Sequence, residues 1–286
     1  MDVFVLNLLN GISWGSILFL VASGLSLILG VMGILNLTHG AMYMVGAFVG
    51  WSIAVQYGLS FWLAALIGGL SAGLISLVIE RGFLRHLYKQ LNEQVLLTFG
   101  LVHILINSTI WIWGARSRAP FTTPFLSGSV SIMGWSYPMT RIAIIVIGGL
   151  LATGLWWLTN KTRVGAMVRA GMDDREMTMG LGINLPLVSV GVFFLGAFLA
   201  GFAGVIGAQV LGVYPGLAMD ILLLALVVVI IGGVGSVGGA LLGSMVIGIV
   251  DSFGKALFPN FAMFTIYLAM VVSLSVRPRG LLGRKI

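Results

Sequence analysis

The chain has 286 residues, of which 59% are hydrophobic and only 8% are charged, and its formal net charge is +7. Soluble domains carry about 25% charged residues, so this composition excludes an ordinary soluble protein and indicates a membrane protein. The apolar segments are continuous rather than alternating, which excludes a transmembrane β-barrel. With no cysteine, disulfides and thiolate metal sites are excluded as well. We therefore expect an all-α fold, a polytopic transmembrane helix bundle with broken Gly-rich helices, as a single domain over residues 1–286.

Nine apolar segments follow one another along the chain and predict helices. About 20 residues are needed to cross ~30 Å of hydrocarbon. The first segment lacks the basic start and the small-residue end of a signal peptide, so we expect it to remain as a helix. The two shortest segments are candidates for half-helices. The predicted helices are Val5–Gly30, Gly40–Gln56, Phe61–Glu80, Gln94–Gly114, Arg141–Thr159, Leu187–Gly212, Ile221–Ile231, Ala240–Phe253 and Ala262–Val276.

Two apolar runs are interrupted by glycine and polar residues, "GVMGILNLTHGAMYM" at 30–44 and "IIGGVGSVGGALLG" at 230–243. Backbone that opens inside a membrane must be buried in protein or line a cavity, because lipid cannot bond to it. Paired breaks of this kind point to a transport pathway. We expect the substrate pathway to include Asn36, Thr38, His39, Gly40, Gln209, Gly233, Gly235 and Ser236.

Individual polar residues allow simpler interpretations. His39 is either a pathway residue or a neutral imidazole bonded to a nearby carbonyl, and Gln209 is expected near an outer helix end, within reach of water. Asp251 and Lys255, four residues apart, are expected to pair at the outer rim. Small residues recur every four positions, which indicates either close packing within the chain or a subunit seam; they are Gly196, Ala200, Gly204 and Ala208, and Ala65, Gly69 and Gly73.

The basic residues are distributed unevenly over the loops. Two loops and the C-terminal tail hold 11 of the 15 Lys and Arg residues and are expected in the cytoplasm by the positive-inside rule. This places the C-terminus and a segment over 160–186 in the cytoplasm, and the N-terminus outside. The net positive charge thus reflects the orientation of the chain in the membrane, and no basic-aromatic module indicates a nucleic-acid partner. The eleven residues are Arg81, Arg85, Lys89, Lys161, Arg163, Arg169, Arg175, Arg277, Arg279, Arg284 and Lys285.

The segment "RAGMDDREMTMGLGINLPL" at 169–187 gathers charges in a chain that has few. Arg169, Asp173, Glu176 and Gly180 have the spacing of one helix face, and Gly180 with the glycine at 182 is expected to end that helix. The helix is either an amphipathic loop at the membrane surface or a docking element for a soluble partner. A lipid-bound helix favours Lys and Arg on its polar face, whereas this face is mixed.

Several stretches together resemble the branched-chain amino acid permease family of ABC importers. "RAGMDDREMTMGLGIN" resembles the cytoplasmic coupling segment of that family. Gly24–Phe48 and Gln94–Ala115 resemble two of its membrane blocks, and "GGVGSVGGALLG" and the tail "RPRGLLGRK" follow in the expected order. The match covers nearly the whole chain and is nearest to the smaller of two paralogous permease subunits, the Liv-type H component.

The resemblance implies a set of partners and a site. The partners are a second paralogous permease subunit, two cytoplasmic ATPase subunits that use ATP and Mg, and an external substrate-binding protein, all at a bacterial inner (plasma) membrane. The implied ATPase-coupling residues are Arg169, Asp173, Asp174, Arg175, Glu176, Gly180, Leu181, Gly182, Ile183 and Asn184. Two departures stand out: Met177 and Thr178 replace the alanines that follow Glu in the general coupling motif, and Ala41 replaces a frequent acidic residue.

Catalytic motifs are missing from the sequence. There is neither an H-E-x-x-H pair nor a phosphate-binding G-x-x-x-x-G-K-[ST] loop, so we expect a non-catalytic subunit that itself binds no cofactor and no metal. Alternative functions stay open at this stage. One is a permease of the same family for urea, amides or another small solute. The others are an ion-coupled secondary transporter and an intramembrane enzyme.

Overall fold

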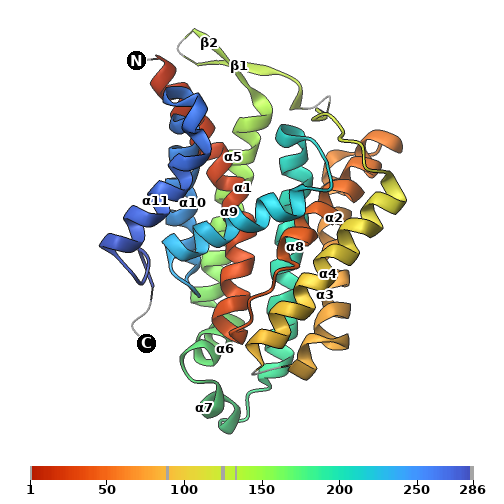
Figure 1. The fold of residues 1–286 in the computed structure, drawn as a ribbon, viewed down its shortest axis with the longest axis vertical. Coiled ribbons are helices and arrows are strands. Elements are labelled where there is room, and N and C mark those ends of the chain that lie inside the picture. Colours follow the sequence, from red (N-terminus) through yellow and green to blue (C-terminus); the bar gives the residue numbers. More distant parts are fainter. Residues whose placement is uncertain (1, 88–89, 124–125, 133, 284–286) are drawn as a thin grey trace.

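The structure is a computed structural model that describes residues 2–87, 90–123, 126–132 and 134–283. It consists of helices with one small hairpin (Figure 1). The helices are α1 (Asp2–Met32), α2 (His39–Trp51), α3 (Phe61–Gly82), α4 (Leu91–Trp113), α5 (Met139–Lys161), α6 (Arg163–Asp173), α7 (Arg175–Gly180), α8 (Leu185–Leu211), α9 (Leu217–Gly232), α10 (Val237–Leu257) and α11 (Ala262–Val276). A π-helical turn, Ser52–Gln56, continues α2, and the antiparallel hairpin pairs β1 (Ser129–Ile132) with β2 (Trp135–Pro138).

All nine predicted helices are present, and both predicted breaks are confirmed. Seven helices in the described part of the chain are long and apolar enough to cross a membrane. The prediction that α10 is a half-helix is wrong, because α10 has 21 residues. Its Gly-rich start, which the sequence predicts as part of the break, is helical and packs closely on α9. With 16 residues, α9 is short for a full crossing, as expected.

The helices α1 and α8 form the centre of the bundle. In the most apolar window of each helix, 89% of α1 residues and 67% of α8 residues are buried, against 17% for α4 and 11% for the last span. α1 packs against α5, α8, α9 and α10, and α8 also contacts α2 and α3. The apolar residues of α4 and α11 therefore face outward, toward lipid or a partner subunit.

The small-residue stripes serve packing within this chain. Gly196 of α8 lies against the backbone of Gly24 in α1, and Gly204 of α8 lies against the Tyr43 carbonyl in α2. On α3, Gly69 and Gly73 face the rings of Phe198 and Phe194 of α8. Backbones approach this closely in lipid only where side chains are small. These stripes are therefore used inside the subunit and are not a subunit seam.

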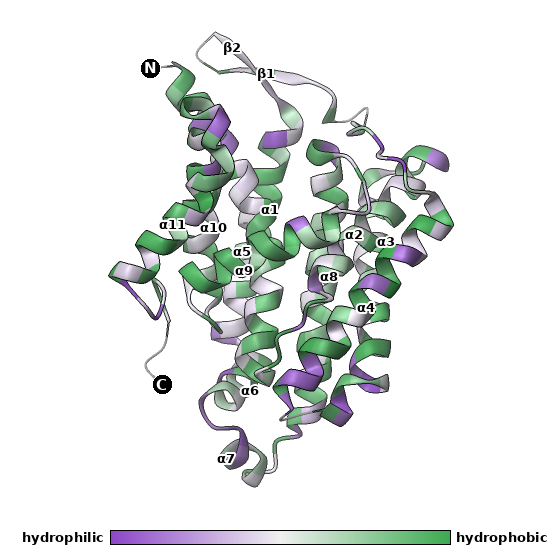
Figure 2. Ribbon diagram, in the orientation of Figure 1, coloured by the Kyte–Doolittle hydropathy of each residue, from purple (hydrophilic) through white to green (hydrophobic). Residues whose placement is uncertain are grey.

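The two ends of the bundle differ in composition. The N-terminus and the hairpin lie at one end, and α6 and α7 lie at the other (Figure 1). Figure 2 shows hydrophilic residues concentrated around α7 and hydrophobic residues along the long helices. The hairpin was not predicted from the sequence.

The basic loops lie at the same end of the bundle. The end of α3, which carries Arg81, lies at the same end of the bundle as α6 and α7 (Figure 1). In the tail, Arg279 lines the same cavity as Met172 of α6. This common end confirms the clustering of basic loops that the sequence predicted, and the side of the membrane it faces stays a prediction. Lys89, Arg284 and Lys285 lie outside the described residues.

Candidate functional site

The charged segment forms two short helices rather than the one that was predicted. Thr162 caps α6, its Oγ1 accepting a hydrogen bond from the Gly165 N–H at 3.1 Å. The helix stops at Asp174, whose backbone is extended (φ −151°, ψ 107°) and whose Oδ1 accepts from the Met177 N–H at 2.9 Å. Asp residues favour this capping geometry, which starts a new helix at Arg175. Arg169 and Asp173 in α6 therefore do not share a helix face with the polar residues of α7.

Glycine ends the segment where the sequence predicted. α7 stops at Gly180, and Gly182 has a left-handed backbone (φ +83°) with its N–H donating to the Met179 carbonyl at 3.0 Å. Asn184 then starts α8, because its Oδ1 accepts from the Leu187 N–H at 3.2 Å. Ile183 lies between these two caps. The segment is thus a short, well-capped excursion between two membrane helices.

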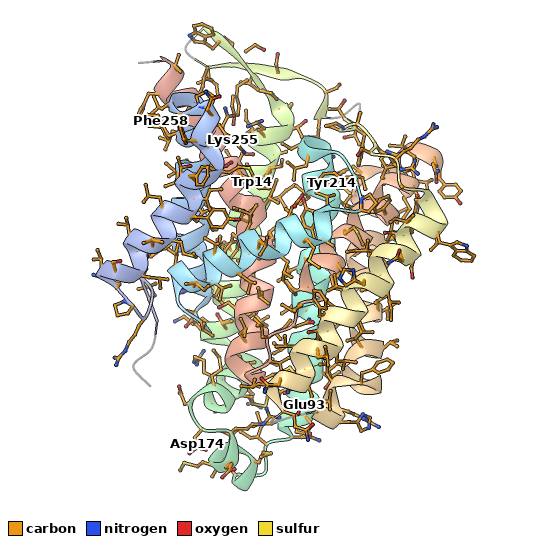
Figure 3. All side chains as sticks on the ribbon, viewed as in Figure 1. Trp14, Glu93, Asp174, Tyr214, Lys255 and Phe258 are labelled. Atoms are coloured by element: carbon orange, nitrogen blue, oxygen red, sulfur yellow. The ribbon has the colours of Figure 1, made fainter. Side chains whose placement is uncertain are left out.

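The tip of this segment exposes apolar and acidic side chains together. Met177 is 66% exposed and Leu181 is 72% exposed. Asp173, Asp174 and Glu176 are exposed beside them, and Asp174 lies at the far end of the molecule (Figure 3). Exposed apolar side chains among charges are typical of a protein-interaction surface. The structure thus brings the ten predicted coupling residues to one end, with Arg169, Arg175 and Ile183 partly buried at their base.

Met172 of α6 connects this segment to both helix breaks, which the sequence did not predict. Its terminal methyl contacts Gly30 near the end of α1 and Gly235 in the break between α9 and α10. These two glycines also lie against each other. Only long-range packing produces this arrangement, and no local pattern around Met172 indicates it. Movement of α6 would therefore act on both breaks at one contact.

The first break, residues 33–38, is closed by its own side chains. The Oδ1 of Asn36 accepts hydrogen bonds from the Thr38 N–H at 3.1 Å and the Thr38 Oγ1 at 2.6 Å. His39 is fully buried, with Nε2 2.9 Å from the Val21 carbonyl of α1. A carbonyl only accepts, so Nε2 carries the proton. The simpler interpretation of His39 as a carbonyl-bonded imidazole is thus the one observed.

The second break, residues 233–236, is held by the chain's tail. Gly233 (φ +98°) and Gly235 (φ +75°) turn the backbone, and Ser236 caps α10 by accepting from the Gly239 N–H at 2.9 Å. The Leu281 N–H donates to the Ile231 carbonyl at 2.7 Å, and the N–H of the next residue donates to the Gly232 carbonyl at 3.0 Å. The tail therefore supplies the partners that α9 lacks at its end.

The other two predicted pathway residues are buried in helix contacts. Gly40 lies against the Ala218 carbonyl and Leu222 where α2 crosses α9, so a side chain there would separate these helices. Gln209 is only 5% exposed, which corrects the expectation that water reaches it. Gln209 does lie near a helix end, two residues before the last residue of α8, but the bundle covers its side chain there. Whether any of the eight residues contacts substrate stays a prediction.

Two polar pairs lie at the opposite end. The Nζ of Lys255 is 2.6 Å from the Oδ2 of Asp251, which confirms the predicted pair. In the loop between α8 and α9, the Tyr214 hydroxyl donates to Asp220 at 2.7 Å. Burial, followed by this carboxylate, raises the pKa of Tyr214 to about 12, so the hydroxyl stays protonated. Among the residues that the structure describes, no group of three or more His, Asp or Glu side chains is placed to hold a metal.

These features define a multi-pass membrane protein with an exposed element at one end and two connected helix breaks. The profile of the family described as "Branched-chain amino acid transport system / permease component" matches residues 7–274. The chain therefore belongs to that family. It is 29% identical over 296 residues to the high-affinity branched-chain amino acid transport system permease protein BraD of Pseudomonas aeruginosa, covering 98% of this chain and 96% of BraD.

Two further relatives come from one organism. The high-affinity branched-chain amino acid transport system permease protein LivH of Escherichia coli is 27% identical, with 98% of this chain and 96% of LivH covered. The corresponding protein LivM is also 27% identical, with 91% of this chain but only 66% of LivM covered. Among solved structures, PsaBC from Streptococcus pneumoniae in complex with a Fab matches with a TM-score of 0.54 at 15% identity. It covers 93% of this chain and 89% of that chain, which supports the fold alone.

Proposed function

We propose that this chain is a permease subunit of an ATP-driven importer for branched-chain or related amino acids. Membership of the permease family supports this function. The observation that carries the coupling role is the α6–α7 segment, which presents exposed Met177 and Leu181 beside carboxylates and contacts both helix breaks through Met172. A soluble protein that binds this tip therefore contacts an element that packs, through Met172, on the backbone breaks of the membrane domain.

The proposed assembly contains the partners that the sequence led us to expect. One is a second permease subunit, because the chain resembles both LivH and LivM of one organism. The others are two cytoplasmic ATPase subunits, which use ATP and Mg, and an external binding protein. This chain is the non-catalytic membrane part, in a bacterial inner membrane with its C-terminus in the cytoplasm. The α6–α7 end then faces the cytosol, in keeping with its basic loops.

The proposed coupling path runs from the tip of the segment into the bundle. Gly171 of α6 packs against the Leu185 side chain at the start of α8, and Met172 contacts the two break glycines. A shift of α6 by a partner would press on these contacts in a core that is too densely packed to absorb it locally. We expect the second break to move first when α6 shifts. The tail, which belongs to neither α9 nor α10, supplies the hydrogen bonds that hold this break.

The direct experiment is ATP-driven uptake of labelled leucine into liposomes that contain all subunits. Replacing residues 173–182 with a ten-residue Gly-Ser linker should abolish both uptake and co-purification of the ATPases. The matched control replaces residues 129–138, the hairpin at the other end, with the same linker and should keep the ATPases bound. Retention of the ATPases after the first replacement would contradict the proposal.

Two alternatives are separated by substrate and by energy source. A permease for urea, amides or another small solute would drive uptake of that solute in the same liposomes while leucine is excluded. An ion-coupled transporter would take up substrate through this chain alone under an ion gradient. That mechanism calls for a carboxylate placed deep in the membrane core, whereas Glu80 and Asp251, the buried described carboxylates, lie toward opposite ends of the bundle.

A further inference from the structure

A cavity of about 350 Å³ opens between α1, α5, α8 and α10 at the end opposite the coupling segment. Its volume lies in the range of small-molecule sites. Figure 3 shows Trp14 and Lys255 in the half of the bundle far from Asp174. The polar lining includes Asn7, Asn10, Trp14, Arg141, Asp251 and Lys255.

The charges of this cavity have opposite signs and unequal numbers. Asp251 is 6% exposed and bonds Lys255 through one oxygen, while the Lys255 side chain is 65% exposed. The Nη1 of Arg141 donates to the neutral Asn10 Oδ1 at 2.6 Å. Two cations and one carboxylate therefore line the cavity, a formal excess of one positive charge. That excess favours a ligand carboxylate, and the second oxygen of Asp251 is suited to a ligand ammonium.

The remaining wall of the cavity is apolar. Ile17, Val210 and Leu211 line it beside the indole of Trp14. The Trp14 Nε1 is buried and has no hydrogen-bond partner among the described residues, although buried indole N–H groups usually find one. A ligand with an apolar side chain next to a charged group would pack on the apolar wall and form hydrogen bonds with the polar groups.

We propose that this cavity is a binding site for a zwitterionic amino acid with an apolar side chain. The α-carboxylate binds Arg141 and Lys255, the α-ammonium binds Asp251, and the side chain packs on Trp14 and Ile17. Lys255 moves from Asp251 to the ligand carboxylate, so that no buried charge is left unpaired. The inference rests on the proposed function for its choice of ligand and adds a site at the mouth of the permease.

The test uses the full chain in lipid nanodiscs without ATPases or nucleotide, and saturation-transfer NMR with L-leucine as the probe. Leucinamide, which lacks the carboxylate, and 4-methylpentanoate, which lacks the ammonium, are matched probes. L-leucine should show transfer and the other two should compete at least about tenfold more weakly, because each loses a charged hydrogen-bond partner. Equal competition by either analogue, or no transfer to leucine above that in empty nanodiscs, would overturn the site.

Variants locate the binding in the cavity. Asp251→Asn and Arg141→Gln should each weaken leucine binding by roughly tenfold or more, and Arg141→Lys should restore part of it. Arg116→Gln, which removes an exposed cation outside the cavity lining, is the control and should bind as the parent does. Each variant is first checked for a parent-like gel-filtration profile.

Two other results bear on the same site. Unchanged leucine binding in both Asp251→Asn and Arg141→Gln would refute the site. The same holds if these variants bind leucine as the parent does and lose only docking of the binding protein. Because the assay contains no energy source, its failure leaves the uptake experiment untouched. Conversely, failed uptake with intact binding would count against the transport mechanism and not against this site.

Discussion

The two helix breaks of this chain are closed in different ways. Residues 33–38 are held locally, by Asn36 bonding Thr38 and by His39 bonding α1. Residues 233–236 depend on distant chain, because tail amides bond the end of α9 and Met172 packs on Gly235. The first break is held by side chains within the bundle. The second break is held by the tail and by α6, which lie outside the membrane core.

This difference indicates which break moves. A joint whose side-chain hydrogen bonds are buried in the bundle resists opening, since breaking a buried hydrogen bond without replacing it costs about 1–3 kcal/mol. The second break is attached to the tail and to α6, both at the proposed cytoplasmic end. A partner that displaces the tail acts on the second break directly. Displacement of α6 acts through Met172 on Gly235 in that break and on Gly30, which lies in α1 three residues before the first break.

The largest expected effect is at His39. His39→Ala removes the side-chain hydrogen bond to the Val21 carbonyl and opens a cavity in the core, so the apparent free energy of unfolding should fall by about 2–4 kcal/mol. Thermal unfolding in detergent, followed by gel filtration, measures it. A variant of parental stability that has lost uptake would instead make His39 a pathway residue, contrary to the view of a structural joint.

A smaller effect is expected at the cap of the same break. Asn36→Ala removes the acceptor for both Thr38 donors and should cost about 1 kcal/mol. Asn36→Ser keeps a side-chain oxygen in a similar local turn and should lose less. The same unfolding measurement applies to both. Equal losses would show that the hydrogen bonds of Asn36 do not hold this joint.

At the second break the effect should be local. Removing residues 278–286 deletes the donors to Ile231 and Gly232, and amide hydrogen exchange should become faster over 228–240 but not over 30–42. The global stability should change by no more than about 1 kcal/mol for each lost bond. The double variant Leu281→Ala, Leu282→Ala keeps both amides and serves as the control. Equally faster exchange over both breaks would remove the distinction between them.

The smallest effect on stability is expected at Met172, and it separates stability from coupling. Met172→Ala shortens a side chain that is only partly buried, so it should cost about 1 kcal/mol or less, below the range for a fully buried Met. Uptake should nevertheless fall several-fold while the ATPases stay bound and hydrolyse ATP. Met263→Ala, at an exposed position of α11 outside the coupling segment, is the matched control. Parental uptake in Met172→Ala would exclude this contact from the coupling path.

The features that could be predicted from the sequence are the local ones. Continuous apolar runs place α11 at its observed bounds, Ala262–Val276, and glycine marks the end of α7. The split at Asp174 was missed because its carboxylate suits a helix face and a helix cap equally well. The cap is favoured here by the extended backbone between α6 and α7.

The features that were missed depend on residues far apart in the chain. Gly40 follows a polar break in an apolar run, a pattern that predicts a substrate pathway. In the structure it lies where α2 crosses α9, and only the fold brings Ala218 against it. The contact of Met172 with Gly30 and Gly235 joins three separate segments. The Asp251–Lys255 pair was predicted from its spacing, but the cavity around it needs α1 and α5 as well.

The most direct measurement uses the absence of native cysteine. Glu176→Cys at the tip of α7 and Ser131→Cys in the hairpin each introduce one thiol, and a membrane-impermeant maleimide reports its side. The account predicts that Cys at 176 is labelled only in inside-out vesicles and is protected when the ATPases are bound, whereas Cys at 131 is labelled only from outside. Labelling of Cys at 176 from outside, or equal labelling with and without the ATPases, would contradict it.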